Sequence, residues 1–158
     1  MPHGRKATYG RIVVDYRPQK ADPNRTRLTV GGDRVEYPHD VSTPTADMVT
    51  AKLLFNSVIS TEGAKFLTVD IKNFYLNTPM ERFEYMRLRY EIIPQEIIEK
   101  YDLDRIKTND GWVYIKIQKG MYGLPQAGIL ANKLLTKHIA RHGYYPCTHT
   151  PGLWRHQW

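Results

Sequence analysis

Apolar and polar residues follow patterns typical of strands in four short stretches of the chain, a central apolar run in the first and a period of two in the other three. Residues 11–16 (RIVVDY) and 27–30 (RLTV) predict two strands, and Gly31-Gly32-Asp33 supplies a turn after the second. A polar connector with Pro18 and Pro23 joins them, which predicts a small basic hairpin that projects from the fold. Residues 84–90 and 112–117 alternate in the same way and predict two further strands.

Helical spacing predicts three helices between these strands. Thr43-Pro44 offers an N-cap hydroxyl and a proline at the first helical position, so we expect a helix from there to about Ser60. Pro94 opens a short helix that runs to Tyr101, and Pro125 opens the longest helix, which Gly143 caps. Because helices and strands do not alternate regularly, the pattern predicts an α+β fold.

The stretch KFLTVDIKNFYLNTPM, residues 65–80, begins with an apolar run that predicts a buried strand, packed under the preceding helix. Asp70 follows at the end of that strand, where a rigidly held carboxylate can bind a divalent metal ion. Asp70 can equally cap the next helical turn. Spacing alone leaves both interpretations open.

The charge balance points to an anionic partner. Lys and Arg outnumber Asp and Glu by 23 to 16, which gives a net charge of +7 and makes nucleic acid the first candidate. The single cysteine, Cys147, excludes an internal disulfide and fits a reducing compartment. No apolar run approaches the roughly 20 residues of a membrane span, so we expect no membrane partner.

The loop GMYGLPQAG, residues 120–128, is the second stretch that can carry chemistry. Its glycines let the backbone approach a ligand, and the helix that follows has an N-terminus that favours anions. Gln126 could hydrogen bond a sugar or a base there. The alternative is that the glycines only make a tight turn from strand to helix.

Taken together, these two stretches resemble a reverse transcriptase, most closely the copia class of LTR retrotransposon Pol polyproteins. The corresponding copia stretches read roughly DVKTAFLNG and LYGLKQA, and here they are DIKNFYLNT (residues 70–78) and MYGLPQA (residues 121–127). Pro125 departs from the copia lysine and is closer to the retroviral form of the turn. The resemblance covers nearly the whole chain.

The resemblance implies roles for individual residues. Asp70 would be the first catalytic carboxylate and would bind two Mg²⁺ ions, one of them with help from the Ile71 carbonyl. Tyr75 would be the steric gate that rejects a 2′-hydroxyl, and Gln126 would contact the incoming nucleotide. The implied dNTP-binding residues are Arg11, Lys72, Asn73, Phe74, Tyr75 and Gln126, and the nucleic-acid-binding residues that we expect are Lys116, Lys119, Lys133 and Lys137.

The implied fold is the fingers and part of the ferredoxin-like palm of a right-hand polymerase. Residues 1–52 and 81–120 would form the fingers, and residues 53–80 and 121–158 the palm. A two-metal site needs more carboxylates, yet residues 111–158 contain no Asp or Glu, so we expect a truncated chain that is inactive alone. Its partners would be an RNA or DNA template with primer, dNTP and the rest of the Pol polyprotein, including the remaining palm, the thumb and RNase H. Its location would be intracellular, in a cytoplasmic particle or the nucleus. The alternative is a non-catalytic nucleic-acid-binding remnant of a retroelement.

Overall fold

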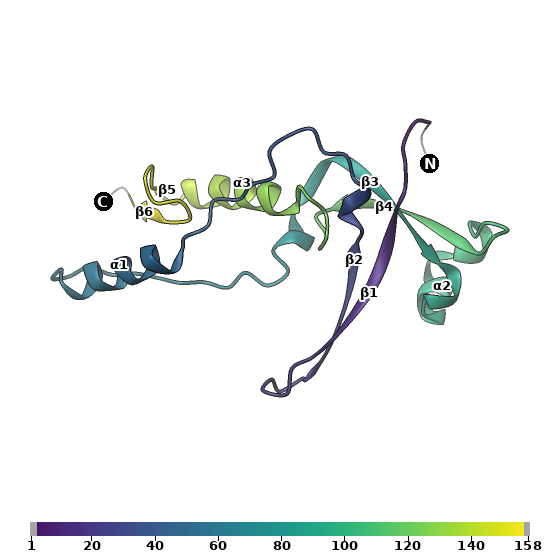
Figure 1. Ribbon diagram of the computed structural model, residues 1–158, viewed down its shortest axis with the longest axis horizontal. Coiled ribbons are helices and arrows are strands. Elements are labelled where there is room, and N and C mark those ends of the chain that lie inside the picture. Colours follow the sequence, from purple (N-terminus) through teal and green to yellow (C-terminus); the bar gives the residue numbers. More distant parts are fainter. Residues whose placement is uncertain (1–2, 157–158) are drawn as a thin grey trace.

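The computed structural model describes residues 3–156 and has a mixed α+β architecture, as the sequence predicts. Its main sheet has four strands in the order β2-β1-β3-β4, labelled in Figure 1. The strands are β1 (Thr8–Tyr16), β2 (Asn24–Val30), β3 (Pro79–Arg89) and β4 (Trp112–Lys119). Strands β1 and β2 form an antiparallel hairpin. Strands β3 and β4 also pair antiparallel, although a helix lies between them in the chain, and a short parallel contact at the start of β1 joins the two pairs.

Three helices and a small second sheet complete the described part of the chain. The helices are α1 (Met48–Ile59), α2 (Gln95–Tyr101) and α3 (Ala127–Ala140). Strands β5 (Tyr144–Pro146) and β6 (Trp154–His156) pair with each other beyond α3. The short 3-10 turns are η1 (Gly32–Arg34), η2 (Tyr75–Asn77), η3 (Tyr90–Ile92) and η4 (Leu103–Arg105).

The core lies on one face of the β3–β4 pair. Because successive strand residues point to opposite faces, every second residue of β3 from Glu84 to Leu88 is buried there. A larger cluster joins these side chains to the end of β2 and the start of α3: Val30, Met80, Met86, Leu88, Ile117, Leu124 and Ala127. A smaller cluster seats α2 against β4: Ile98, Leu103 and Val113.

Helix α1 begins later than the sequence predicts. Thr43 and Pro44 are not helical, and the N-cap is Asp47, whose carboxylate accepts a hydrogen bond of 2.6 Å from the Thr50 amide. That hydrogen bond satisfies a free amide of the first turn, a role for which aspartate is well suited. Residues 43–46 instead cross the N-terminal part of α3, where Gly128 lies close to Thr43.

The prediction of a buried strand before Asp70 is wrong. Residues 65–70 have no regular secondary structure and all are exposed, Leu67 by 81%. The physical reason is that no strand within residues 3–156 pairs with this stretch, so its backbone has no ladder to join. The predicted layering of a helix over this strand is therefore also wrong, although Phe66 does contact Phe55 of α1, with ring centroids 4.9 Å apart.

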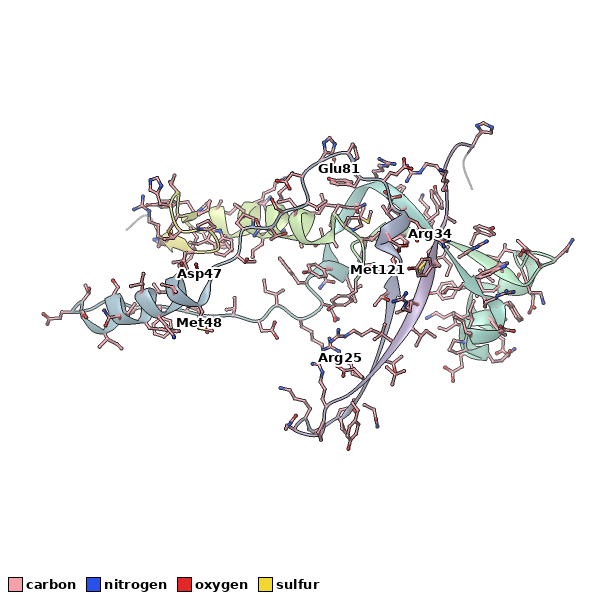
Figure 2. All side chains as sticks on the ribbon, in the orientation of Figure 1. Arg25, Arg34, Asp47, Met48, Glu81 and Met121 are labelled. Atoms are coloured by element: carbon pink, nitrogen blue, oxygen red, sulfur yellow. The ribbon has the colours of Figure 1, made fainter. Side chains whose placement is uncertain are left out.

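Helix α1 and residues 60–72 together form an arm that reaches away from the main sheet (Figure 1). In Figure 2, Asp47 and Met48 at the start of α1 lie far from Arg34 at the base of the β1–β2 hairpin. Most apolar side chains of the arm are exposed, among them Met48, Leu53, Ile59 and Leu67. No helix within the described range is long and apolar enough to cross a membrane.

Candidate functional site

The stretch DIKNFYLNT folds into a sharp turn that places two aromatic rings together. Asn73 adopts a left-handed conformation with φ of 55°, and its carbonyl accepts a 3.1 Å hydrogen bond from the Asn77 amide. The Thr78 hydroxyl donates to the Phe74 carbonyl at 3.1 Å. As a result the rings of Phe74 and Tyr75 lie side by side, with centroids 5.8 Å apart.

The loop of residues 120–128 packs directly on this turn. The Gly120 amide donates a 2.7 Å hydrogen bond to the Thr78 carbonyl, and a Cβ at Gly120 would lie only 2.6 Å from the Tyr75 carbonyl oxygen. The ring of Tyr122 meets that of Tyr75 edge to face, at a centroid distance of 5.4 Å. The two stretches that resemble polymerase motifs therefore form one structural unit.

The end of strand β2 closes on the same loop. The Val30 amide donates a 2.8 Å hydrogen bond to the Tyr122 carbonyl, and Met121 packs against the core beside the end of β2 (Figure 2). Gly123, at φ of 95°, approaches so closely that a Cβ there would collide with the Val30 carbonyl oxygen. Glycine is required at this position by both the conformation and the space.

One face of the β1–β2 hairpin is strongly basic. Residues paired across an antiparallel ladder share a face, and the pairs here are Arg11 with Thr29, Val13 with Arg27, and Asp15 with Arg25. A hydrogen bond of 2.7 Å from Arg17 lowers the pKa of the Asp15 carboxyl, and the charges of Arg27 and Arg25 lower it further. Asp15 therefore stays ionised and its negative charge is balanced by Arg17, while the remaining arginines leave this face of the hairpin positively charged.

Arg27 links this basic face to the two stretches. Its guanidinium carbon lies 5.8 Å from the centroid of the Tyr122 ring, within cation–π range. Its Nε is buried and has no hydrogen-bond partner among residues 3–156. Neither Arg27 nor Tyr122 was predicted from the sequence as a site residue. The period of two in NRTRLTV, which puts Arg25, Arg27 and Thr29 on one face, could have indicated Arg27.

The implied nucleotide-binding residues are divided between two clefts. Arg11 lines a cleft of about 340 Å³ between the hairpin and the loop, together with Tyr9, Thr29, Gly31, Gly32, Asp33, Val30, Gly123 and Pro125. Phe74 and Tyr75 line a second cleft of about 300 Å³ beside α3, together with residues 43–46 and Trp154. Lys72 and Asn73 are exposed on the turn. The structure thus brings Tyr75 to the loop but places Arg11 in a different cleft.

Gln126 is buried, with 1% of its surface exposed. Its Nε2 lies 3.4 Å from a carboxylate oxygen of Glu84, a buried residue whose other oxygen forms a 2.8 Å salt bridge with Arg5. The Oε1 of Gln126 has no hydrogen-bond partner within the described chain. In this arrangement Gln126 belongs to a polar network under the loop. Its contact with a nucleotide stays a prediction.

Asp70 and Ile71 are exposed on the arm side of the turn. No backbone amide in the described range donates to Asp70, so the capping alternative is not what holds it. Nor do three His, Cys, Asp or Glu side chains gather anywhere in residues 3–156 as ligands for a metal ion. Two divalent ions need several carboxylate ligands, and residues 70–78 and 120–128 together supply one, that of Asp70. The described chain therefore does not fit a two-magnesium site.

The four lysines expected to bind nucleic acid are all exposed and lie on two elements. Lys116 and Lys119 are on β4, three residues apart and hence on opposite faces of the sheet, whereas Lys133 and Lys137 are one turn apart on α3. They form no single patch.

Comparisons of the chain with known proteins found no match. A scan against protein-family models, a search of curated proteins and a search of solved structures each returned none.

Proposed function

We propose that this chain is part of an RNA-directed DNA polymerase and contributes the nucleotide-facing turn and loop of its fingers and palm. The observation that supports this most is the packing of DIKNFYLNT against GMYGLPQAG, through Tyr75 on Tyr122 and the Thr78–Gly120 hydrogen bond. A chance resemblance of two separate stretches gives no reason for them to meet in space. Arg27 then brings a positive charge to their junction.

In the proposed reaction the chain's own residues bind and orient the incoming nucleotide. Tyr75 lines the cleft beside α3 with its ring held between Phe74 and Tyr122, so it presents a rigid wall to a sugar. A rigid wall rejects a 2′-hydroxyl by its bulk, without a hydrogen bond. Asp70 is the one carboxylate at the turn, and no catalytic step through magnesium follows from one carboxylate.

The sugar preference tests the role of Tyr75. The whole chain is titrated with dUTP and with UTP, which differ only in the 2′-hydroxyl, each with Mg²⁺, and binding is followed by calorimetry. We expect dUTP to bind more tightly, Tyr75→Ala to remove the preference, and Tyr75→Phe to keep it because the ring is retained. Tyr101→Ala is the matched control, since Tyr101 is an exposed tyrosine on α2. Equal binding of both nucleotides to the wild-type chain would contradict the proposal.

The dependence on Asp70 is a second test. A contact between a carboxylate and a charged group is worth about 1.5–3 kcal/mol, so Asp70→Asn should weaken dTTP binding in Mg²⁺ by roughly 10- to 150-fold. Asp110→Asn, at an exposed aspartate in the turn before β4, should leave binding unchanged. If Mg²⁺ has the same effect on nucleotide binding by the wild type and by Asp70→Asn, Asp70 has no role at the site.

Primer extension tests whether the single carboxylate of Asp70 is enough for catalysis. Since one carboxylate does not hold two metal ions, we expect no extension of a primer on an RNA template by this chain with Mg²⁺. Extension that is clearly above background and lost in Asp70→Ala would show that the missing ligands are present.

The second candidate is a nucleic-acid-binding protein without catalysis, which the single carboxylate at the turn and the basic face of the β1–β2 hairpin favour. It predicts duplex binding that is independent of Asp70. Each lysine that neutralises a phosphate contributes about 0.9 to the slope of log affinity against log salt on duplex DNA, so Lys133→Ala and Lys137→Ala should each reduce that slope.

A further inference from the structure

The outward face of the β3–β4 pair carries a distinct set of side chains. The residues of β3 and β4 that face the core are buried, Val113 completely. The residues between them point the other way, toward solvent, and none of those in the paired region from Tyr85 to Arg89 and Trp112 to Lys116 is acidic. We call this set the platform, and it consists of Tyr85, Arg87, Arg89, Trp112, Tyr114 and Lys116.

The strand register gives the platform a regular chemical pattern. Tyr85 lies opposite Lys116, Arg87 opposite Tyr114, and Arg89 opposite Trp112. Every pair across the two strands therefore joins one aromatic ring and one cation. Two of the cations nevertheless lie over a ring other than the opposite one. Arg87 lies over Trp112, and the Lys116 Nζ lies 4.0 Å from the centroid of the Phe83 ring, so the Tyr114 ring stays uncovered.

The two arginines are held in place by one aromatic ring. The guanidinium carbons of Arg87 and Arg89 lie 4.4 and 4.2 Å from the centroid of the Trp112 ring. Stacking of this kind fixes the plane of a guanidinium and leaves its N–H donors at the edge free for a phosphate. Arg89 donates one weak hydrogen bond, 3.3 Å long, to the Asp110 carbonyl, but no carboxylate in the described chain pairs with Arg87, Arg89 or Lys116.

Tyr114 is open to a ligand at the centre of this pattern. It is 38% exposed, and its ring contacts no other aromatic ring or cation within residues 3–156. An exposed ring between fixed cations offers a base a surface for stacking while its phosphates meet the charges. In a duplex the faces of the bases are covered by their neighbours, so this arrangement suits a single strand.

We propose that the platform binds single-stranded nucleic acid, with a base on Tyr114 and the backbone phosphates on Arg87, Arg89 and Lys116. An acidic peptide would pair with the cations, but its carboxylates would not stack on the exposed Tyr114 ring. The platform is separate from Asp70 and Tyr75, because β3 and β4 present it on the side of the sheet opposite the core that seats the 120–128 loop. The inference therefore does not depend on the polymerase proposal, and Asp70→Asn should leave it unaffected.

Fluorescence anisotropy with a labelled oligothymidylate of about 12 nucleotides tests the platform on the whole chain. Base stacking on an aromatic side chain is lost in Tyr114→Ala, so we expect binding to weaken roughly 5- to 150-fold, while Tyr114→Phe keeps the ring and the affinity. Tyr101→Ala is the matched control for loss of an exposed tyrosine. A circular dichroism melt of each variant shows whether the fold is retained.

The salt dependence separates the role of the cations. Each phosphate contact on a single strand contributes about 0.7 to the slope of log affinity against log salt, so Arg87→Ala and Lys116→Ala should each lower the slope by about that amount. Lys52→Ala, at an exposed lysine on α1, should not change it. Unlabelled duplex DNA should compete less well than the unlabelled single strand.

Three results would overturn the inference. One is wild-type affinity for the oligonucleotide in folded Tyr114→Ala. The second is duplex DNA that competes as well as the single strand, which would mean that charge alone binds. The third is displacement of the oligonucleotide by polyglutamate, together with polyglutamate binding that is equally tight to the wild type and to folded Tyr114→Ala. That result would identify the platform as a docking site for acidic peptides.

Discussion

The main sheet and the arm have similar apolar sequences but opposite surroundings. In β3, Met86 and Leu88 alternate with outward polar residues and are buried against β4, the loop and the end of β2. In the arm, Leu67 and Val69 alternate in the same way and are exposed. The difference lies in the partners, because β3 has a neighbouring strand on each side and residues 65–70 have none in the described chain.

This contrast teaches that an apolar pattern specifies a strand only where another strand supplies hydrogen bonds. Strands β3 and β4 exchange backbone hydrogen bonds along most of their length, apart from a bulge after Pro79. The unpaired N–H and C=O groups of residues 65–70 instead face solvent, as at the edge of a sheet. The arm therefore adds apolar surface without adding stability.

The largest effect should come from removing a core side chain. Leu88 is 6% exposed, so Leu88→Ala should lower the free energy of unfolding by about 2–5 kcal/mol through lost burial and a cavity. Leu67→Ala makes the same chemical change in the arm and should alter stability by at most about 0.5 kcal/mol. Urea unfolding of both variants measures the contrast, and equal losses would mean that the arm is packed in solution.

Two glycines give the next largest difference. Gly123→Ala must strain a φ of 95° and push a Cβ into the Val30 carbonyl, so the loop and β2 have to move apart. Gly63→Ala, at φ of 74° in the arm, meets no atom within 4 Å and should cost only the conformational strain of about 1–2 kcal/mol. Thermal melts should show the larger loss for Gly123→Ala. The same loss at both sites would show that the close approach at Gly123 is absent.

Charges on the arm should change aggregation more than stability. Leu67→Lys and Val69→Lys place cations along an exposed apolar stretch with unpaired backbone groups, and such charges oppose edge-to-edge association. We expect light scattering of the chain to fall with little change in the unfolding midpoint. Asn109→Lys adds the same charge at an exposed position in the turn before β4, away from any unpaired strand edge. It is the control and should leave scattering unchanged.

The smallest effect should come from the helix cap of the arm. The hydrogen bond from the Thr50 amide lowers the pKa of the Asp47 carboxyl, so the ionised form favours the folded helix. Stabilisation by a carboxyl with a lowered pKa is present above the pKa of the unfolded chain and is lost as the pH falls through the lower, folded value. Asp47→Ala should therefore reduce α1 helicity at pH 7, and the difference from wild type should shrink in acid. Asp47→Asn, which can still accept the hydrogen bond, should remove most of the pH dependence.

Much of the fold could be predicted from local patterns. The strands β1, β3 and β4, the short helix α2 and the body of α3 follow from alternation, proline positions and turn residues, and their bounds differ from the prediction by a few residues. These elements have their partners within the described chain, so local preference and tertiary contacts agree. The start of α1 was harder because Thr43 and Asp47 both offer an N-cap, and only Asp47 accepts the capping hydrogen bond.

The candidate site was less predictable because its contacts join distant stretches. The meeting of Tyr75 with Tyr122 crosses more than forty residues, and the position of Arg27 over that ring depends on the hairpin register. The sequence indicated Gln126 as a residue open to ligand, but its burial beside Glu84 depends on which face of β3 turns inward. Alternation marks two faces of a strand and does not say which is covered.

The close approach of Gly32, Gly123 and Val30 has a mechanical consequence. A Cβ at Gly32 would collide with the Gly123 carbonyl, just as one at Gly123 would collide with that of Val30, so backbone meets backbone with no side chain between. Such a joint has no compliant layer to absorb movement. We therefore expect a displacement of the β1–β2 hairpin at its base to be passed directly to the loop that leads into α3.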